Sequence, residues 1–330
     1  MRVVIVGAGA LGSLFGALLH EAGRRVTLIE RNPQTIRAIR RHGLILETDG
    51  EERRVDVDIR SARRVRDRCD MLLLFVKSYD TEGAVACVEH VRTAATWVGS
   101  FQNGIGNVEQ IARIVDTSKI FAGSLAYSSE QTGINRIRYT GGAGALRISP
   151  MCPDAAGFGG AASVFDDLGF PVETPSDYRS QLWNKLIMNA SANALAAVTG
   201  FTAGELVRDD SCREIMDRTA REAAHVALAH GIAIDRPDDP VAPLYRALEG
   251  IGANKPTMLQ DVERGRQTEI DALNGAVVAA GTAVGVEAPF NQMLALQIRS
   301  IEARRLSPVR LGHEGLPVSV AKPHDLSVMP

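Results

Sequence analysis

Three polar residues recur at helical spacing within one apolar segment of the chain. In residues 180–200, SQLWNKLIMNASANALAAVTG, Lys185, Asn189 and Asn193 are each four positions apart, so on a helix they form one narrow stripe. A lysine in apolar surroundings needs a partner or loses its proton easily. The stripe therefore either lines a cleft or joins two domains through hydrogen bonds to backbone, and spacing alone favours neither.

A second polar cluster lies in residues 255–271, KPTMLQDVERGRQTEID. Thr257 and Glu269 are twelve positions apart, slightly over three helical turns, and Gly265 could bend the segment between them. We predict one long helix over 257–284. We expect the other charged residues here to form a solvated helix face. These residues are Asp261, Glu263, Arg264 and Arg266.

A glycine-rich loop at the start of the chain indicates a dinucleotide site. Residues 1–6 are an apolar strand, the sequence Gly-x-Gly-x-x-Gly follows at once, and a helical pattern continues to about residue 22. Gly7 permits the tight turn, Gly9 lets backbone approach a pyrophosphate, and Gly12 lets helix and strand pack closely. A purely structural turn is the alternative. The residues assigned to this cofactor loop are Gly7, Ala8, Gly9, Ala10, Leu11 and Gly12.

The positions of these motifs predict an α/β fold with two domains. Strand patterns at 26–30, 55–59, 71–76 and 96–101 alternate with helices, which is typical of a Rossmann-type, doubly wound parallel sheet. Later strands at 120–126, 136–139 and 145–148 lack helices between them and could run antiparallel. Further helices are predicted at 178–199, 209–230 and 289–304. We therefore predict a dinucleotide-binding domain over 1–175, an all-α domain over 176–306 and an irregular tail over 307–330.

Ligand-binding residues are expected where parallel strands end. Lys77 follows the apolar strand at 71–76, and a doubly wound sheet binds its ligands at the carboxyl ends of its strands. Asn103 lies in the Gly/Asn turn QNGIGN that follows the strand at 96–101.

Composition excludes several classes of protein. The 330 residues carry a formal net charge of −2 and no basic block, which argues against nucleic-acid binding. No apolar run reaches the ~18 residues of a membrane span. A strand begins at the N-terminus, so we expect no signal peptide. The four cysteines are widely scattered, so neither a zinc site nor a disulfide framework is expected. We predict a cytoplasmic enzyme without a metal.

Five segments together resemble the ketopantoate reductase family. They are GAGALG, LLLFVKS, QNGIGN, LWNKLIMNASANAL and KPTMLQDVERGRQTEIDALNG, which follow in that order over residues 1–304. The resemblance implies NADPH-dependent reduction of 2-dehydropantoate to (R)-pantoate, in pantothenate biosynthesis. A reductase of another 2-oxo acid is the runner-up. A non-catalytic NAD(P)-binding redox sensor is a third reading, although it has no use for the Lys/Asn/Asn stripe.

The resemblance also implies roles for residues on the substrate side. Lys185 takes the place of the family's general acid, and an ammonium beside the carbonyl oxygen suits that role. Asn189 and Asn193 fall at the positions of substrate-binding asparagines. Thr257 would hold the substrate carboxylate. Asn103 would contact both nicotinamide ribose and substrate.

On the cofactor side the resemblance places Glu269 where it would orient the cofactor or Lys185. Arg31 falls where the family binds the 2′-phosphate of NADP(H). Glu30 precedes it, and an acidic residue at this strand end suits the free 2′-hydroxyl of NAD(H). We favour NADP(H), with NAD(H) still open.

One residue departs from the family pattern. Ala203 stands where the family often has an asparagine, so one hydrogen bond to the substrate is expected to be missing. The identity of the 2-oxo acid is therefore open. Residues 271–285, rich in Ala and Gly, could pack inside the domain or in the seam of a homodimer.

Overall fold

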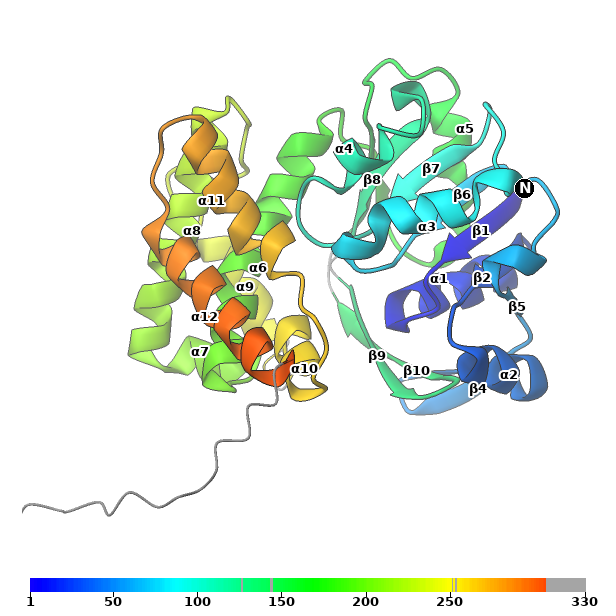
Figure 1. The fold of residues 1–330 in the computed structure, drawn as a ribbon, viewed down its shortest axis with the longest axis horizontal. Helices are drawn as coiled ribbons and strands as arrows, with labels where there is room; N and C mark the ends of the chain where they lie inside the picture. The colour runs from blue at the N-terminus through cyan, green and yellow to red at the C-terminus, as the bar shows by residue number, and fades with distance from the viewer. Residues whose placement is uncertain (126, 143–144, 251, 253, 307–330) are drawn as a thin grey trace, which may run out of the picture.

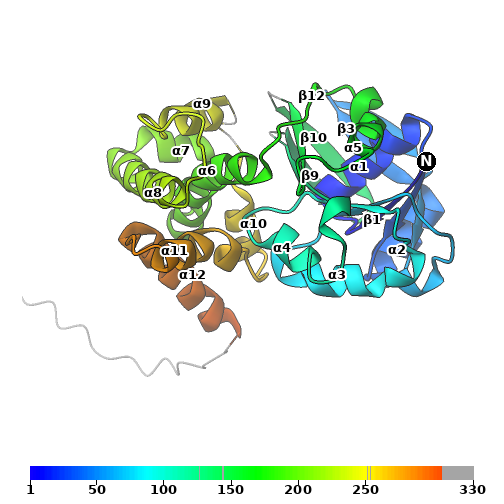
Figure 2. The same ribbon diagram turned by 90° about the horizontal axis from the view of Figure 1, so that it is seen from above.

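A β-sheet with flanking helices and a bundle of helices lie side by side in the molecule (Figures 1 and 2). The computed structural model describes residues 1–125, 127–142, 145–250, 252 and 254–306. The predicted tail over 307–330 lies outside the described residues. The boundary predicted at 175/176 falls in the connection between the last strand of the sheet and the first helix of the bundle.

The main sheet has eight strands in the order β12-β11-β8-β7-β6-β1-β2-β5. The strands from β8 to β5 are parallel, and β11 runs antiparallel to β8. This confirms the doubly wound prediction and the change of direction in the later strands. The bounds are β1 Arg2–Val6, β2 Arg25–Ile29, β5 Asp58–Arg60, β6 Met71–Leu74, β7 Trp97–Ser100, β8 Ile120–Ser124, β11 Leu146–Pro150 and β12 Val172–Glu173.

Helices cover both faces of this sheet because its central strands are apolar on both sides. In β1, Val3 and Ile5 pack in one core, while Val4 and Val6 pack in the other. The first core is covered by α1 and α5, and the second by α3 and α4. The bounds are α1 Ala10–Glu21, α2 Pro33–His42, α3 Thr81–Cys87, α4 Asn107–Ile111 and α5 Phe158–Ala162.

A second sheet of four strands, in the order β4-β3-β10-β9, was not predicted. Its strands are β3 Leu44–Thr48, β4 Glu51–Val55, β9 Tyr127–Gly133 and β10 Arg136–Gly142. The single strand predicted at 55–59 is wrong. That segment is divided between the end of β4 and the start of β5, which belong to different sheets. A local alternating pattern cannot reveal such a change of partner.

The helical part is built around α6, whose bounds match the prediction. The Asp177 side chain caps its first turn by accepting from Arg179 N, and Gly200 ends it with φ 80°. Helix α6 packs against α8, α10 and α12. The bounds are α6 Tyr178–Thr199, α7 Ala203–Arg208, α8 Asp210–Ala229, α9 Ala242–Gly250, α10 Thr257–Glu263, α11 Asn274–Ala283 and α12 Pro289–Leu306.

The first turns of α6 also bind the main sheet. The Ser149 hydroxyl donates to Gln181 Oε1 (2.6 Å), and Gln181 Nε2 donates to Arg147 O (3.0 Å). One helix thus contacts the sheet at its start and forms the core of the bundle further along. Lys185 lies about two turns after the start of α6.

The single helix predicted over 257–284 is wrong. Helix α10 ends at Glu263, and Gly265 adopts φ +65°, a conformation that L-residues rarely take. Arg266 N then donates to Asp261 O (2.8 Å), which closes the helix end. A short 3-10 turn, Ile270–Ala272, and helix α11 follow. The break places Glu269 in a turn instead of on a helix face.

Within the described residues, no helix combines the length and apolar character needed to cross a bilayer. The same residues contain no group of three or more His, Cys, Asp or Glu side chains placed to bind a metal ion.

Candidate active site

A large cleft lies between the sheet and the helical bundle. Its volume is about 2550 Å³, and residues of both parts line it, from the glycine loop after β1 to helices α6, α9 and α10. The predicted site residues that line it are Gly7, Ala8, Gly9, Ala10, Leu11, Arg31, Lys77, Asn103, Lys185, Asn189, Asn193, Thr257 and Glu269.

The glycine loop is shaped by close packing on one side and by open space on the other. A Cβ at Gly12 would lie 2.0 Å from Gly7 O, and one at Gly7 would lie 2.9 Å from the Phe75 carbonyl carbon. A Cβ at Gly9 would meet no atom within 4 Å. Gly7 and Gly12 therefore allow tight packing, while Gly9 leaves backbone accessible at the start of α1. This geometry fits a pyrophosphate at the helix N-terminus.

Charged residues surround the cleft where β2 ends. Glu30 Oε1 accepts from the backbone N–H groups of Arg31 and Asn32, both at 2.8 Å. The Arg31 side chain is 85% exposed, and its Nη1 lies 3.3 Å from Asp80 Oδ2. The Glu30 carboxylate is thus bound to its own loop, while the Arg31 guanidinium pairs with Asp80, at the end of the 3-10 turn before α3.

The stripe on α6 faces the cleft. Lys185, Asn189 and Asn193 all line it, and their side chains make no hydrogen bond to any described residue. Asn184, outside the stripe, binds protein instead: its Nδ2 donates to Ser180 O (2.8 Å). The stripe therefore offers its polar atoms to a ligand, and the reading in which it binds backbone across domains finds no support.

Burial changes the acidity of Lys185. Removal from water lowers the pKa of its ammonium to about 8, and the charge of Glu269 opposes that change. A lysine with this pKa holds its proton at neutral pH and can give it up to an acceptor in the cleft.

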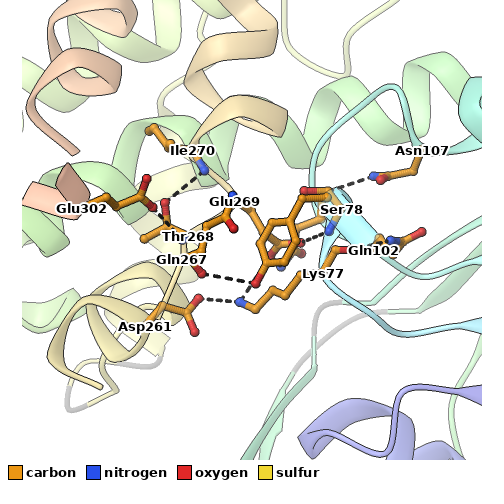
Figure 3. A network of polar contacts seen from close by, with 12 residues as sticks. Lys77, Ser78, Gln102, Asn107, Asp261, Gln267, Thr268, Glu269, Ile270 and Glu302 are labelled. Atoms are coloured by element: carbon orange, nitrogen blue, oxygen red, sulfur yellow. Dashed lines mark hydrogen bonds and ion pairs between the residues drawn. The ribbon is translucent and has the colours of Figure 1, made fainter. Parts of the chain in front are cut away.

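Lys77 lies in the same cleft but is tied to two buried carboxylates (Figure 3). Its Nζ donates to Asp261 Oδ2 and lies 3.6 Å from Glu269 Oε2. Burial acts to lower the pKa of Lys77, but the charges of Glu269 and Asp261 outweigh it, so that pKa is raised. Lys77 is therefore a fixed cation that joins the end of β6 to the helical part.

Glu269 also binds the sheet part through two neutral donors. Ser78 N donates to its Oε1 (3.0 Å), and Asn103 Nδ2 donates to its Oε2 (3.4 Å). The side chain is only 6% exposed. One carboxylate of the helical part therefore orients Lys77 and Asn103, two of the predicted site residues.

The solvated position predicted for Asp261 is wrong. Its side chain is 8% exposed and paired with Lys77, whereas Glu263, Arg264 and Arg266 are exposed as predicted. The helix break at Gly265 and the approach of Lys77, 184 positions earlier, cause this burial. Asp261 is thus a site residue that the local charge pattern concealed.

A buried polar network under the cleft holds the backbone of Lys77 and Asn103. Gln102 Nε2 donates to Lys77 O (3.3 Å) and to Thr81 Oγ1 (2.8 Å). Asn107 Nδ2 donates to Asn103 O (3.0 Å). These residues were not predicted as part of the site, although Gln102 and Asn107 belong to the QNGIGN turn.

Two positions singled out in the sequence, Thr257 and Ala203, lie near the start of α10. Thr257, its first residue, is exposed and lines the cleft. Ala203 is fully buried, and its N–H donates to Asn254 O (3.0 Å). Ala203 is absent from the described lining of the cleft, whereas Asn254, which was not predicted, contributes to it.

Family models cover most of the chain. The model described as "Ketopantoate reductase PanE/ApbA" matches residues 3–152, and "Ketopantoate reductase PanE/ApbA C terminal" matches residues 177–302. A 2-dehydropantoate 2-reductase of Pyrococcus abyssi is 32% identical over 305 residues, which is 92% of this chain and 98% of that protein. The chain belongs to the ketopantoate reductase family. A second relative in this family, the 2-dehydropantoate 2-reductase of Archaeoglobus fulgidus, is 30% identical, covering 92% of this chain and 98% of that protein.

Solved structures agree with membership of the ketopantoate reductase family. A PanE/ApbA family ketopantoate reductase from Ralstonia eutropha is 34% identical, with a TM-score of 0.84 over 93% of this chain and 100% of that one. A D-mandelate dehydrogenase, solved with NADH and anilino(oxo)acetate, is 26% identical, with a TM-score of 0.88 over 93% and 100%. A structure named as a ketopantoate reductase and one named as a D-mandelate dehydrogenase thus share this architecture.

Proposed function

We propose that this protein reduces 2-dehydropantoate to (R)-pantoate with NADPH, the reductive step of pantothenate biosynthesis. The observation that carries the proposal is Lys185, a lysine in the cleft with its pKa lowered to about 8 and no hydrogen-bond partner among the described residues. Family membership supports the same reaction, since relatives at 30% and 32% identity are 2-dehydropantoate 2-reductases.

The loop of Gly7, Ala8, Gly9, Ala10, Leu11 and Gly12 would hold the cofactor pyrophosphate, and its open side at Gly9 fits that group. The chemistry that a nicotinamide supplies here is a hydride for the C2 carbonyl carbon. Lys77 and Asn103, which both contact Glu269 in the cleft, would contact its ribose side together with Glu269. The exposed Arg31 supports NADPH, and NADH remains the second candidate.

Lys185 would donate the proton that completes the reduction. Negative charge develops on the carbonyl oxygen as the carbon is reduced, and an adjacent ammonium stabilises that charge and then protonates it. Asn189 and Asn193 lie along the same face of α6, so their amides would bind the hydroxyl and carbonyl groups of the substrate. Thr257, at the start of α10, also lines the cleft and would hold the carboxylate.

A second candidate is the reduction of another 2-oxo acid. Ala203 is buried and carries no polar side chain, so the substrate hydrogen bond expected from an asparagine there is missing. The similarity to a D-mandelate dehydrogenase adds weight, because that enzyme acts on an acid with an aromatic substituent.

A panel of 2-oxo acids, assayed with NADPH and with NADH, separates the candidates. The panel needs 2-dehydropantoate, an aliphatic branched 2-oxo acid and phenylglyoxylate. We expect the highest kcat/KM for 2-dehydropantoate with NADPH. A higher value for phenylglyoxylate would support the second candidate, and cofactor binding without turnover of any acid would indicate a redox sensor.

We further propose that the enzyme works in the cytoplasm. All four cysteines are free thiols, which suits a reducing compartment.

A homodimer is also proposed, since Met293 and Leu296 of α12 are 58% and 51% exposed. Light scattering on the purified protein would give its oligomeric state.

A further inference from the structure

Strands β2 and β5 are neighbours at one edge of the main sheet (Figure 1). The loops that follow these two strands meet at one corner of the cleft. The strands pair in parallel, with Ile29 opposite Arg60, and Glu30 N donates to Arg60 O (3.0 Å). The loop at Glu30 and Arg31 and the 3-10 turn Ala62–Arg64 therefore leave the sheet side by side. Both loops line the cleft, through Arg31 on one and Arg63 on the other.

The charged side chains at this corner differ in whether other residues of the protein already bind them. Glu30 accepts two backbone N–H groups, and Arg31 is paired with Asp80. Arg63 is exposed and has no hydrogen bond or ion pair with any described residue. Of the two guanidinium groups in this part of the cleft, Arg63 is therefore the one that a ligand anion can bind without displacing a carboxylate.

A ribose 2′-phosphate at this position needs more than one cation. It carries close to two negative charges at neutral pH, and Glu30 adds another nearby. Arg31 must exchange Asp80 for the phosphate, which reduces its net gain. A second arginine offers a bidentate guanidinium of the geometry that phosphate prefers.

We propose that Arg63 is a second determinant of NADPH specificity, binding the ribose 2′-phosphate together with Arg31. The proposal rests on the cofactor of the proposed function. It assigns Arg63 to the phosphate itself and not to the adenine ring, on which a guanidinium could also stack.

The test compares two nucleotide fragments, adenosine 2′,5′-bisphosphate and adenosine 5′-monophosphate, by titration calorimetry. They differ only in the 2′-phosphate, and neither requires turnover. We expect Arg63→Ala to weaken the bisphosphate about tenfold, the scale of a hydrogen bond to a charged group, and to leave the monophosphate unchanged. The loss should shrink as salt rises, and Arg63→Lys should recover part of it.

Arg64→Ala is the matched control. Arg64 belongs to the same 3-10 turn and is exposed, but it is not among the described residues that line the cleft. An equal loss for both nucleotides in Arg63→Ala would assign the residue to adenine and overturn the proposal, as would a loss no larger than that in Arg64→Ala. A wild-type protein that binds the two nucleotides equally would instead refute the NADPH preference of the proposed function, and the role of Arg63 with it.

Discussion

Lys77 of the sheet part and Lys185 of the helical part lie in the same cleft, yet their pKa values are shifted in opposite directions. Lys77, at the end of β6, contacts two buried carboxylates and its pKa is raised. Lys185, two turns into α6, has no hydrogen-bond partner among the described residues and its pKa is lowered to about 8. The surroundings thus make the ammonium of Lys77 harder to deprotonate and that of Lys185 easier to deprotonate.

The largest effect is expected at Lys185. Lys185→Ala should lower kcat by roughly 10²–10⁴-fold, the usual contribution of a positioned proton donor. Cofactor affinity should change little. Lys119→Ala, which removes a lysine stacked on Trp97 instead, should leave kcat unchanged. Steady-state kinetics of all three proteins check this, and near-normal kcat in Lys185→Ala would remove Lys185 from the role of acid.

Substitution of Lys77 should act first on stability. Lys77→Met leaves Asp261 and Glu269 buried without their cation, and we expect a loss of about 2 kcal/mol in the free energy of unfolding. This is below the roughly 3–5 kcal/mol of a fully buried pair, because the Lys77 side chain is 32% exposed. Lys185→Ala should not destabilise the fold, since it removes a desolvated charge.

Urea denaturation gives the free energy of unfolding of Lys77→Met and of Lys185→Ala. A double-mutant cycle of Lys77→Met with Asp261→Asn tests the pairing of Lys77 with Asp261. The double variant should be more stable than the sum of the single losses predicts. Strict additivity would mean that Lys77 and Asp261 do not interact in solution.

Asn193→Ala should affect substrate but not cofactor. Asn193 lines the cleft and is 7% exposed, with no hydrogen bond to a described residue. Loss of one hydrogen bond predicts a KM for the 2-oxo acid about threefold to tenfold higher. The NADPH dissociation constant, measured by fluorescence titration, should stay unchanged. A parallel loss of NADPH affinity would point to a packing role.

The charge of Glu269 acts on both Lys77 and Lys185, so its substitution should shift the pH dependence of the reduction rate. The charge of Glu269 raises the pKa of Lys185, so Glu269→Gln should lower that pKa further. With Lys185 as the proposed proton donor, the decline of the reduction rate at alkaline pH should therefore begin at a lower pH in the variant. Glu263→Gln, which changes an exposed carboxylate paired with Lys255, is the control. A decline at unchanged or higher pH in Glu269→Gln would contradict this coupling.

The sequence predicted best those elements whose signals are local. The bounds of α6 follow from the Asp177 cap, the apolar run and Gly200, all within one segment. The glycine loop was equally evident, because strand, turn and helix are consecutive. The spacing of the stripe on α6 followed from the same segment, but that it faces a cleft required the structure.

Non-local contacts explain what the sequence could not predict. The burial of Asp261 depends on Lys77, 184 positions away, and on a helix end at Gly265. The second sheet pairs β3 with β10, so that Ile45 of β3 lies opposite Arg136 of β10, far away in the chain. No local pattern distinguishes Arg63 from the other arginines near it in the sequence. Its position at the cleft follows from the pairing of β5 with β2.

The pH dependence of kcat/KM for the 2-oxo acid tests the central claim, that Lys185 donates the proton with a lowered pKa. In the wild-type protein kcat/KM should fall above about pH 8, tenfold per pH unit, and Lys185→Ala should lack that decline. A wild-type decline only near the pKa of an ordinary lysine, about 10.4, or the same decline retained in Lys185→Ala, would contradict it.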